Sequence, residues 1–555
     1  MRNKKVFIFL AALCSFLLSC EDLSETNLNP NGIIADNVHP NLVLPTVLTE
    51  AARIYVNLGY QDIAGVVQHT QKDAWFEGHN DYDWAGGQDW AGYYSVLRNN
   101  DLVYERAVEM KLEFHQGVAL VMNSFMFGLV ADLWGDAPYT NALKGESGKL
   151  SDVKPSFDSQ ETIYNGILAN LETANTLLSK NENEYDGIEG DADVFFDGDP
   201  EAWRRFANSL ALRYYMRISA KSADVAKAGI EKIVGNPSQY PIITSSDEDV
   251  TMGFPGTSPD TSWPASTAFD PSESNYKRIK MAATLVEALQ TKNDPRLAVW
   301  ASKVQMPLVV DAGLPPGTDK KENGKRYLSP DKLIDSNGNP IAYDTDPEYV
   351  GLPTGLVGPS AYNLNETPGQ TSNNLHVSYL NPIYKASSGE LLKARLISAA
   401  EVHFILAEAA VKGWAAGDAE EHYEEGVRAS LETWKVDDDY ATYIAEPEVI
   451  FPAAGTDAEK LEQIIEQKWI ASWTAATEAW FDFRRTGLPT LTAGPHGQRG
   501  VLPVRFYYAQ NELMLNSDNA GAAVQGLEVT SYSQADGNNS AWSKPWLIKG
   551  TGKPW

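Results

Sequence analysis

The chain has 555 residues, more than the roughly 250–300 residues that one hydrophobic core usually serves, so we expect several subdomains or an extended architecture. It carries 45 Lys and Arg against 74 Asp and Glu, and the net charge of −29 repels phosphate backbones and anionic lipid headgroups. This charge argues against nucleic-acid binding and against electrostatic binding to membranes. The 15 Trp and 25 Tyr residues supply flat rings that either fill cores or stack on a ligand.

Residues 1–19 have the pattern of a bacterial export signal. Three basic residues precede an apolar run that ends in "LLSC" at Cys20. The run is shorter than the about 20 apolar residues that a membrane-spanning helix needs. An ordinary secretory signal fits this pattern, but "LLSC" also resembles a lipobox, in which the cysteine becomes the first mature residue and is acylated. We therefore predict a lipid anchor at Cys20, with palmitate as the expected fatty acid, and a tether over residues 20–39.

Acidic residues follow the lipobox at Glu21, Asp22 and Glu25. They resemble the signal that sends lipoproteins of Bacteroidetes-type bacteria to the cell surface, although a solvated tether has the same composition. Cys14 lies in the segment that is removed, so the mature chain keeps Cys20 alone and has no disulfide. Its stability must therefore come from burial of apolar side chains.

Apolar residues recur at three- and four-residue spacing through much of residues 40–235, which predicts an N-terminal helical part. Ser159 is in position to cap one helix, and Asp199 and Pro200 have the residue types of a helix start. A further helix is apolar nearly all round, as expected of a buried one. The helices are predicted over residues 100–110, 115–134, 159–180 and 199–222.

The middle of the chain, residues 236–394, differs in texture. Residues 236–278 and 306–390 are rich in Pro, Gly, Ser, Asn and Asp, with one short helical stretch between them and no long strand. Loops of this length in a compact protein are usually functional or disordered. We expect an irregular, loop-rich part here.

Helices resume in the C-terminal part, residues 395–555. A helical hairpin is predicted over 398–434, broken between Gly413 and Gly417, and a further helix over 459–487. Small residues at the crossings suggest a stack of helical hairpins of the TPR type. A generic helical bundle fits the irregular period equally well, so the pattern alone leaves both open.

Five segments in order resemble the SusD/RagB family of nutrient-binding outer membrane lipoproteins, in its second SusD-like branch. One departure is Ala509 after Tyr508, where the family usually has proline. The segments are "VADLWGDAPYTNAL" (130–143), "FFDGDPEAWRRFANSLALRYYMRIS" (195–219), "AAEVHFILAEAAVKGW" (399–414), "IIEQKWIASWTAATEAWFDFRRTGLPTL" (464–491) and "LPVRFYYAQNELMLN" (502–516).

This resemblance implies a mostly α fold, with a TPR-type scaffold and an irregular ligand-binding region. It implies a protein on the outer membrane, facing the cell exterior, that captures oligosaccharides and has no chemistry of its own. It also implies a partner, a SusC-like TonB-dependent barrel that the lipoprotein covers as a hinged lid. Some members of the family bind peptides, and a peptide-binding RagB-type function is the alternative.

Most aromatic and basic residues of these segments have structural interpretations. Arg484 and Arg485 follow "WFDF" at a predicted helix end, where a salt bridge and an interaction with the helix C-terminus are favoured over a ligand clamp. Six tryptophans lie in or beside the periodic helices, and we predict that they pack in the core. They are Trp134, Trp203, Trp414, Trp469, Trp473 and Trp480.

Two loop segments offer better ligand contacts, residues 69–94 and 261–276. A sugar ring has a weakly apolar face, which suits aromatic side chains, and a rim of hydroxyls, which suits Asn, Asp and Gln. Trp84 and Trp90 have an alternative, in which they begin a helix and pack inward. The predicted ligand-binding residues are Trp75, Asn80, Tyr82, Asp83, Trp84, Trp90, Trp263, Phe269 and Tyr276.

Neither a metal site nor a catalytic motif is predicted. His69 and His79 are ten residues apart with no cysteine near them, which does not match zinc spacing. Residues 186–199 are rich in oxygen ligands but depart from the calcium-loop pattern at Phe195, so we expect no cofactor beyond an adventitious calcium. We expect no enzyme, although a glycoside hydrolase leaves no fixed spacing between its two carboxylates. A purely structural lipoprotein is a further, less favoured reading.

Overall fold

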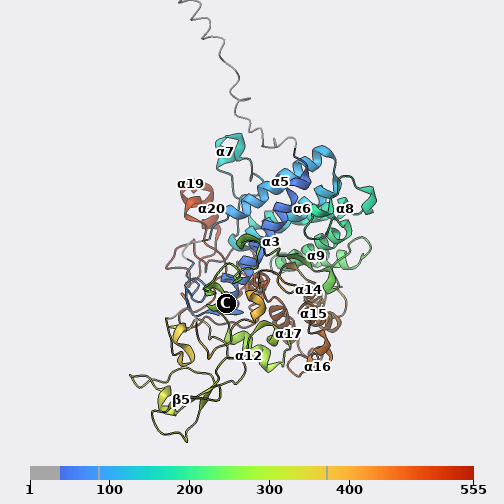
Figure 1. Cartoon of the computed structure of the whole chain (residues 1–555). Helices are drawn as coiled ribbons and strands as arrows, with labels where there is room; N and C mark the ends of the chain where they lie inside the picture. Colours follow the sequence, from blue (N-terminus) through green and yellow to red (C-terminus); the bar gives the residue numbers. More distant parts are fainter. Residues whose placement is uncertain (1–37, 85–87, 370–372) are drawn as a thin grey trace, which may run out of the picture.

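The computed structural model describes residues 38–84, 88–369 and 373–555. The predicted export signal, the anchor at Cys20 and most of the tether lie outside these residues. The described chain is mostly helical, and its short strands hold loops together rather than forming a large sheet (Figure 1). The predicted fold class is confirmed.

The N-terminal helices pack as successive neighbours, α5 on α6, α6 on α8, α8 on α9 and α9 on α10. The predicted starts are correct: the side chain of Ser159 accepts a hydrogen bond from the Thr162 N–H, and that of Asp199 accepts one from the Glu201 N–H. The helices are α3 (Leu44–Tyr60), α4 (Asp62–Val66), α5 (Ala91–Met110), α6 (Glu113–Trp134), α7 (Leu150–Val153), α8 (Gln160–Leu177), α9 (Pro200–Ile218) and α10 (Ala223–Val234).

Helix α6 lies at the centre of this part. Within the described residues it alone is long and apolar enough to cross a membrane, yet 94% of its most apolar window is buried inside the protein. Its side chains are covered on nearly all sides, as its uniform hydrophobicity predicts. Gly128 of α6 lies against the phenol of Tyr214 on α9, so the absence of a side chain there permits the close crossing.

The middle of the chain contains short helices and strands joined by long loops. Strand β1 pairs with β3 and β2 with β7, both antiparallel, and β4, β6 and β5 form a small sheet. This small sheet belongs to a lobe at the end of the molecule opposite α7 (Figure 1). The elements are β1 (Thr70–Lys72), β2 (Val250–Gly253), α11 (Ser274–Lys277), β3 (Ile279–Met281), α12 (Ala283–Thr291), α13 (Arg296–Trp300), β4 (Leu308–Val310), β5 (Asp319–Glu322), β6 (Lys325–Leu328) and β7 (Lys393–Ile397).

The C-terminal helices confirm the predicted hairpin, and Asp418 caps its second helix. The single helix predicted over 459–487 is wrong, because the chain turns between α17 and α18, with a left-handed backbone at Thr474 (φ 70°). The helices are α14 (Ala399–Val411), α15 (Ala419–Thr433), α16 (Tyr440–Tyr443), α17 (Asp457–Ala471), α18 (Ala476–Thr486), α19 (Gln510–Leu515) and α20 (Ser517–Gly526).

Buried ion pairs join these helices to one another and to the N-terminal part. Arg485 forms a two-point ion pair with Glu408 of α14, and Arg484 contacts Asp132 of α6 at 3.2 Å. The prediction that both arginines form structural salt bridges is therefore confirmed. Of the six tryptophans predicted to pack in the core, five are buried and Trp414 is partly exposed.

Candidate binding site

The pairing of β1 with β3 brings the two predicted loop segments together. Thr70 lies opposite Met281 and Lys72 opposite Ile279, and the ladder extends one step further because the Asp73 N–H donates to the Arg278 carbonyl at 3.1 Å. In an antiparallel pair, the chain leaving one strand and the chain entering the other lie at the same end. The loop with Trp75 and the segment before β3 therefore share one end of this ladder.

A buried ion pair supports that end. The Nζ of Lys280 lies 3.0 Å from a carboxylate oxygen of Asp73, and both side chains are buried, with exposures of 0% and 2%. The same ammonium lies 4.0 Å from the centre of the Tyr379 ring, which in turn stacks on Tyr276. Because a buried charge without a partner is costly, this arrangement holds both strands and the aromatic segment in a fixed relation.

A pocket with a volume of about 310 Å³ opens between α3 and the segment 254–275. Its size is at the lower end of the range typical of small-molecule sites. Its lining mixes aromatic, amide and charged side chains in the way that sugar recognition needs. The lining residues include Arg53, Asn57 and Gln61 on one side, and Phe254, Asp260, Trp263, Phe269, Asp270 and Asn275 on the other.

The wall formed by α3 and its C-terminal end is polar. Arg53, Asn57 and Gln61 are spaced by four residues and so lie along one face, while the opposite face of α3 is buried in the core. Asn57 and Gln61 are exposed, and each amide both donates and accepts hydrogen bonds. Arg53 is paired with Glu50 at 2.8 Å and lies 3.5 Å from Asp260 across the pocket.

The opposite wall carries three aromatic rings among polar residues. The Trp263 ring is 1% exposed and packs edge-on against Tyr60 and Phe254, with centroid distances of 5.1 and 5.8 Å. Its backbone is fixed, because the Trp263 N–H donates to the Ser387 carbonyl at 2.9 Å. The Phe269 ring is 46% exposed. Trp263 therefore shapes the floor, and Phe269 has a ring surface available for stacking.

Asp270 orders the segment that carries these rings. Its carboxylate accepts hydrogen bonds from the hydroxyl and the N–H of Ser272 and from the N–H of Asn275. The hydrogen bond from the Ser272 hydroxyl is the main reason that the pKa of Asp270 is lowered to about 2. The carboxylate is therefore ionised at neutral pH, and its hydrogen bonds stabilise the turn of residues 270–275.

The four predicted residues on the loop that follows β1 differ in their exposure to solvent. Trp75 is 73% exposed and has a left-handed backbone (φ 53°), which few non-glycine residues adopt. Asp83 is also exposed. Asn80 is fully buried, with its side-chain amide bonded to the N–H and the carbonyl of Lys72, and Tyr82 is fully buried as well. Asn80 and Tyr82 thus stabilise the loop from inside, and Trp75 and Asp83 project from it.

Three other predicted residues also lie in the core. Trp84 packs edge-on against Phe506 at 4.9 Å and donates its indole N–H to the Gly78 carbonyl. Trp90 packs against Trp134. Tyr276 donates its hydroxyl to the Leu380 carbonyl. Trp84, Trp90 and Tyr276 are 4–7% exposed, so the inward packing named above as the alternative holds for both tryptophans and they offer no open ring face in this conformation.

The polar wall on α3 was not found from the sequence. Its residues occupy the outer face of an amphipathic helix, where polar residues at four-residue spacing are expected of any solvated surface. Only the approach of the segment 254–275 turns this face into one side of a pocket. No local sequence pattern distinguishes these pocket residues from those of an ordinary solvated helix face.

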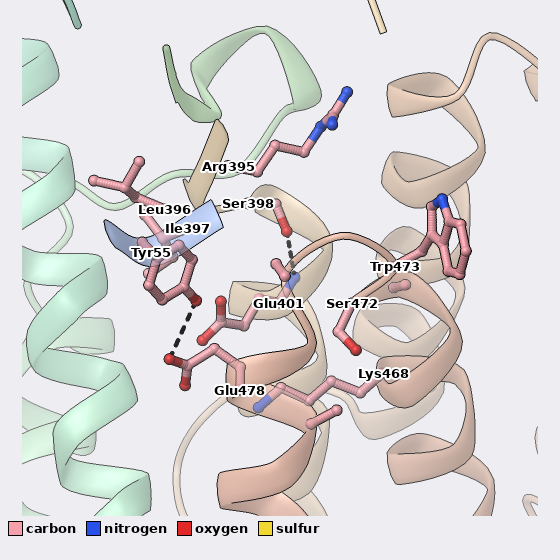
Figure 2. A pocket seen from close by; sticks show the side chains of 13 residues that line it. Tyr55, Arg395, Leu396, Ile397, Ser398, Glu401, Lys468, Ser472, Trp473 and Glu478 are labelled. Atoms are coloured by element: carbon pink, nitrogen blue, oxygen red, sulfur yellow. Dashed lines mark hydrogen bonds between the residues drawn. The ribbon is translucent and has the colours of Figure 1, made fainter. Parts of the chain in front are cut away.

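A second cavity lies inside the protein between α3, β7, α14, α17 and α18 (Figure 2). Its volume is about 30 Å³, enough for one or two water molecules and too small for a sugar. Figure 2 shows the Tyr55 hydroxyl directed at Glu478, with Glu401 beside them, and the hydroxyl donates to Glu478 at 3.3 Å. Glu401, Lys468 and Glu478 line this cavity, so it lies among the buried charges that join α14, α17 and α18.

Among the described residues, no group of three or more His, Cys, Asp or Glu side chains is arranged to hold a metal ion. In the oxygen-rich segment 186–199, the Asp193 carboxylate accepts hydrogen bonds from three backbone N–H groups and from the Trp203 indole. Asp193 therefore acts as the structural centre of a turn.

The architecture and the pocket define a class of protein, a helical scaffold with a surface pocket lined by aromatic, amide and charged side chains. The chain belongs to the second SusD-like family, described as "Starch-binding associating with outer membrane", whose profile matches residues 38–509. The predicted family is confirmed. No curated protein sequence is significantly similar to the chain.

Solved structures share the fold over almost the whole chain. An outer membrane protein of Bacteroides vulgatus, described as involved in nutrient binding, is 25% identical, with a TM-score of 0.71, and the match covers 92% of this chain and 100% of that one. A SusD homologue of Bacteroides uniformis is 23% identical (TM-score 0.70; 91% and 99% covered). A chitin-binding SusD homologue of Flavobacterium johnsoniae is 22% identical (TM-score 0.69; 92% and 99% covered).

Proposed function

We propose that the mature protein is a lipoprotein of the outer membrane, facing the cell exterior, that captures oligosaccharides in the pocket between α3 and residues 254–275. The observation that carries the proposal is the composition of this pocket, where exposed amides on one wall face the exposed ring of Phe269 and the buried ring of Trp263 on the other. A pyranose presents an apolar face and a rim of hydroxyls to these two kinds of group. The family description and the chitin-binding homologue support a carbohydrate ligand.

Trp75 supplies a second contact beyond the pocket. It lies on the loop that the β1–β3 ladder holds at the same end as the segment before β3. An oligosaccharide, rather than a single sugar, is long enough to use both. Binding then adds modest contributions from several rings, each on the order of 1 kcal/mol.

The bound oligosaccharide passes to a SusC-like TonB-dependent barrel, over which the protein closes as a lid. This part of the proposal rests on the membership of the SusD-like family. In it the chain binds and releases its ligand without breaking a bond.

Affinity electrophoresis against starch, chitin oligomers and other soluble polysaccharides tests the site. We expect Phe269→Ala and Trp75→Ala each to weaken binding of the preferred glycan about 5-fold, since each removes one stacked ring of about 1 kcal/mol. Tyr343→Ala is the matched control, because Tyr343 is 44% exposed and lies outside the pocket. Its retardation should equal that of the parent.

The rim is tested separately with Asn57→Ala and Gln61→Ala. These side chains are exposed, so the variants should unfold at the same temperature as the parent and bind the glycan more weakly. Equal retardation of all four site variants and the parent would place the glycan elsewhere. Binding of mixed peptides and of no glycan, measured by calorimetry, would replace the proposal by the peptide-binding alternative.

A further inference from the structure

An exposed aliphatic ridge lies on α7 and α19, away from the candidate binding site. Leu150 and Val153 of α7 are 72% and 57% exposed, and Met514 and Leu515 at the end of α19 are 70% and 69% exposed. Two pairs of large apolar side chains this exposed, each pair on one short helix, are uncommon on a soluble surface and mark contact with another apolar phase. These four residues are called the aliphatic ridge below.

The two halves of the ridge meet at one groove. Val153 and Leu515 line the same groove, which has a volume of about 720 Å³. Asn516 donates its side-chain amide to the Pro155 carbonyl at 2.9 Å, and Asn519 donates to the Lys154 carbonyl at 3.2 Å. The segment after α7 is thus bonded to the segment after α19, so the ridge is a built feature of the fold.

The ridge lies at the end of the molecule to which the N-terminus is attached. Figure 1 places α7, α19 and α20 at the upper end with α5, opposite the lobe of β5. The first described residue, Val38, is held to α5, since the side chain of Arg106 donates to its carbonyl at 3.1 Å. The proposed acylated Cys20 is 18 residues before Val38, which limits the reach to about 60 Å when fully extended.

We infer that the aliphatic ridge rests on the lipid surface of the outer membrane when the protein is not engaged with a partner. The inference rests on the lipid anchor of the proposed function, because a tether of this length keeps the ridge at high effective concentration beside the bilayer. The contact depends on apolar side chains and not on charge attraction, because the chain as a whole is acidic. Lys144, Lys149 and Lys154 are exposed around the α7 half and lower the local negative charge at the contact.

Fluorescence quenching in vesicles tests the inference on the full acylated chain. Met514→Cys and Leu150→Cys each introduce the one thiol that is neither acylated nor removed, and this thiol is labelled with a polarity-sensitive dye. The vesicles contain phosphatidylethanolamine and phosphatidylglycerol, with lipids that carry a quencher near the headgroup. Ile334→Cys is the control, because Ile334 is 46% exposed and follows Leu333, which packs with Leu308 and Leu328 of the small sheet.

We expect at least 3-fold stronger quenching at positions 514 and 150 than at 334. Adding Leu150→Glu and Leu515→Glu to Met514→Cys should reduce the quenching to that of the control, with unchanged circular dichroism. Equal quenching at all three positions overturns the inference. So does a probe at 514 that lipid does not quench but that a co-purified barrel protein shields, which would assign the ridge to the partner.

The glycan test separates this inference from the rest of the proposed function. A chain recovered without acylation overturns both the anchor and the role of the ridge. Unchanged retardation of that chain by polysaccharide would leave the binding site in place. If the parent binds no glycan but the quenching still depends on position, the proposed oligosaccharide ligand is wrong and the membrane contact of the aliphatic ridge stands.

Discussion

Substituting Arg213 by methionine tests the buried charge network that joins the two helical parts. The guanidinium of Arg213 on α9 donates two hydrogen bonds to the Glu401 carboxylate, at 2.7 and 2.6 Å, and one to the Leu396 carbonyl at 2.6 Å. Its side chain is 3% exposed, and that of Glu401 is 11% exposed. Glu478 lies 3.6 Å away.

The expected cost follows from what the substitution leaves behind. Arg213→Met keeps most of the side-chain volume but removes the ion-pair partner of the Glu401 carboxylate. Breaking one side of a buried pair costs about 3–5 kcal/mol. The double variant Arg213→Met with Glu401→Leu removes both charges, and we expect it to recover at least half of that loss. Lys303→Met is the control, since its pair with Glu348 is exposed on both sides and should not change the stability measurably.

Urea unfolding, followed by tryptophan fluorescence, measures all three variants against the parent. The reasoning predicts a large fall in midpoint for Arg213→Met, a partial return in the double variant, and no shift for the control. A loss below about 1 kcal/mol for Arg213→Met, or a double variant no more stable than the single one, would contradict it.

Three further predictions concern pH and packing. Burial alone raises the pKa of Glu408, but the charge of Arg485 outweighs burial and holds this pKa below its ordinary value. The ion pair therefore stabilises the fold above about pH 4, and its contribution is lost as the pH falls further. The stability of Arg485→Met should fall less steeply than that of the parent in this acid range. The pH dependence at Asp249 is opposite, because burial raises its pKa to about 7 and its ionisation costs stability as the pH rises from about 4 to 7. Asp249→Asn should therefore gain stability relative to the parent over that interval. A difference that does not change with pH would refute this. Gly128→Ala should cost about 1–3 kcal/mol in thermal or urea unfolding because a Cβ there displaces Tyr214, whereas Gly521→Ala on α20, with open space around it, should be neutral or gain up to about 1 kcal/mol.

Several features could be predicted from short stretches of sequence. The caps at Ser159 and Asp199 were predicted correctly because a cap is a contact between residues two or three positions apart. The buried helix α6 followed from its uniform hydrophobicity in the same way. The turn at Thr474 was missed, since apolar periodicity continues across it; in the fold this turn lies against Gly59 of α3, far away in the sequence.

The exposure of the candidate ligand residues depended on partners far along the chain. Trp84 is covered by Phe506 of the C-terminal part, while Trp75, nine residues earlier in the same loop, remains exposed. The two have the same residue type and similar neighbours, so no local pattern separates them. The polar wall at Asn57 became part of a pocket only because the segment 254–275 lies against it.

The sequence by itself determined the helical class, the order of helical and irregular parts, and the family, since each depends on periodicity, caps and segment order within the chain. The tertiary structure alone decided which aromatic rings are open to a ligand and which polar residues face them. The physical reason is that burial of a side chain is the sum of contacts with segments hundreds of residues away, and these contacts leave no trace in the local pattern of residues.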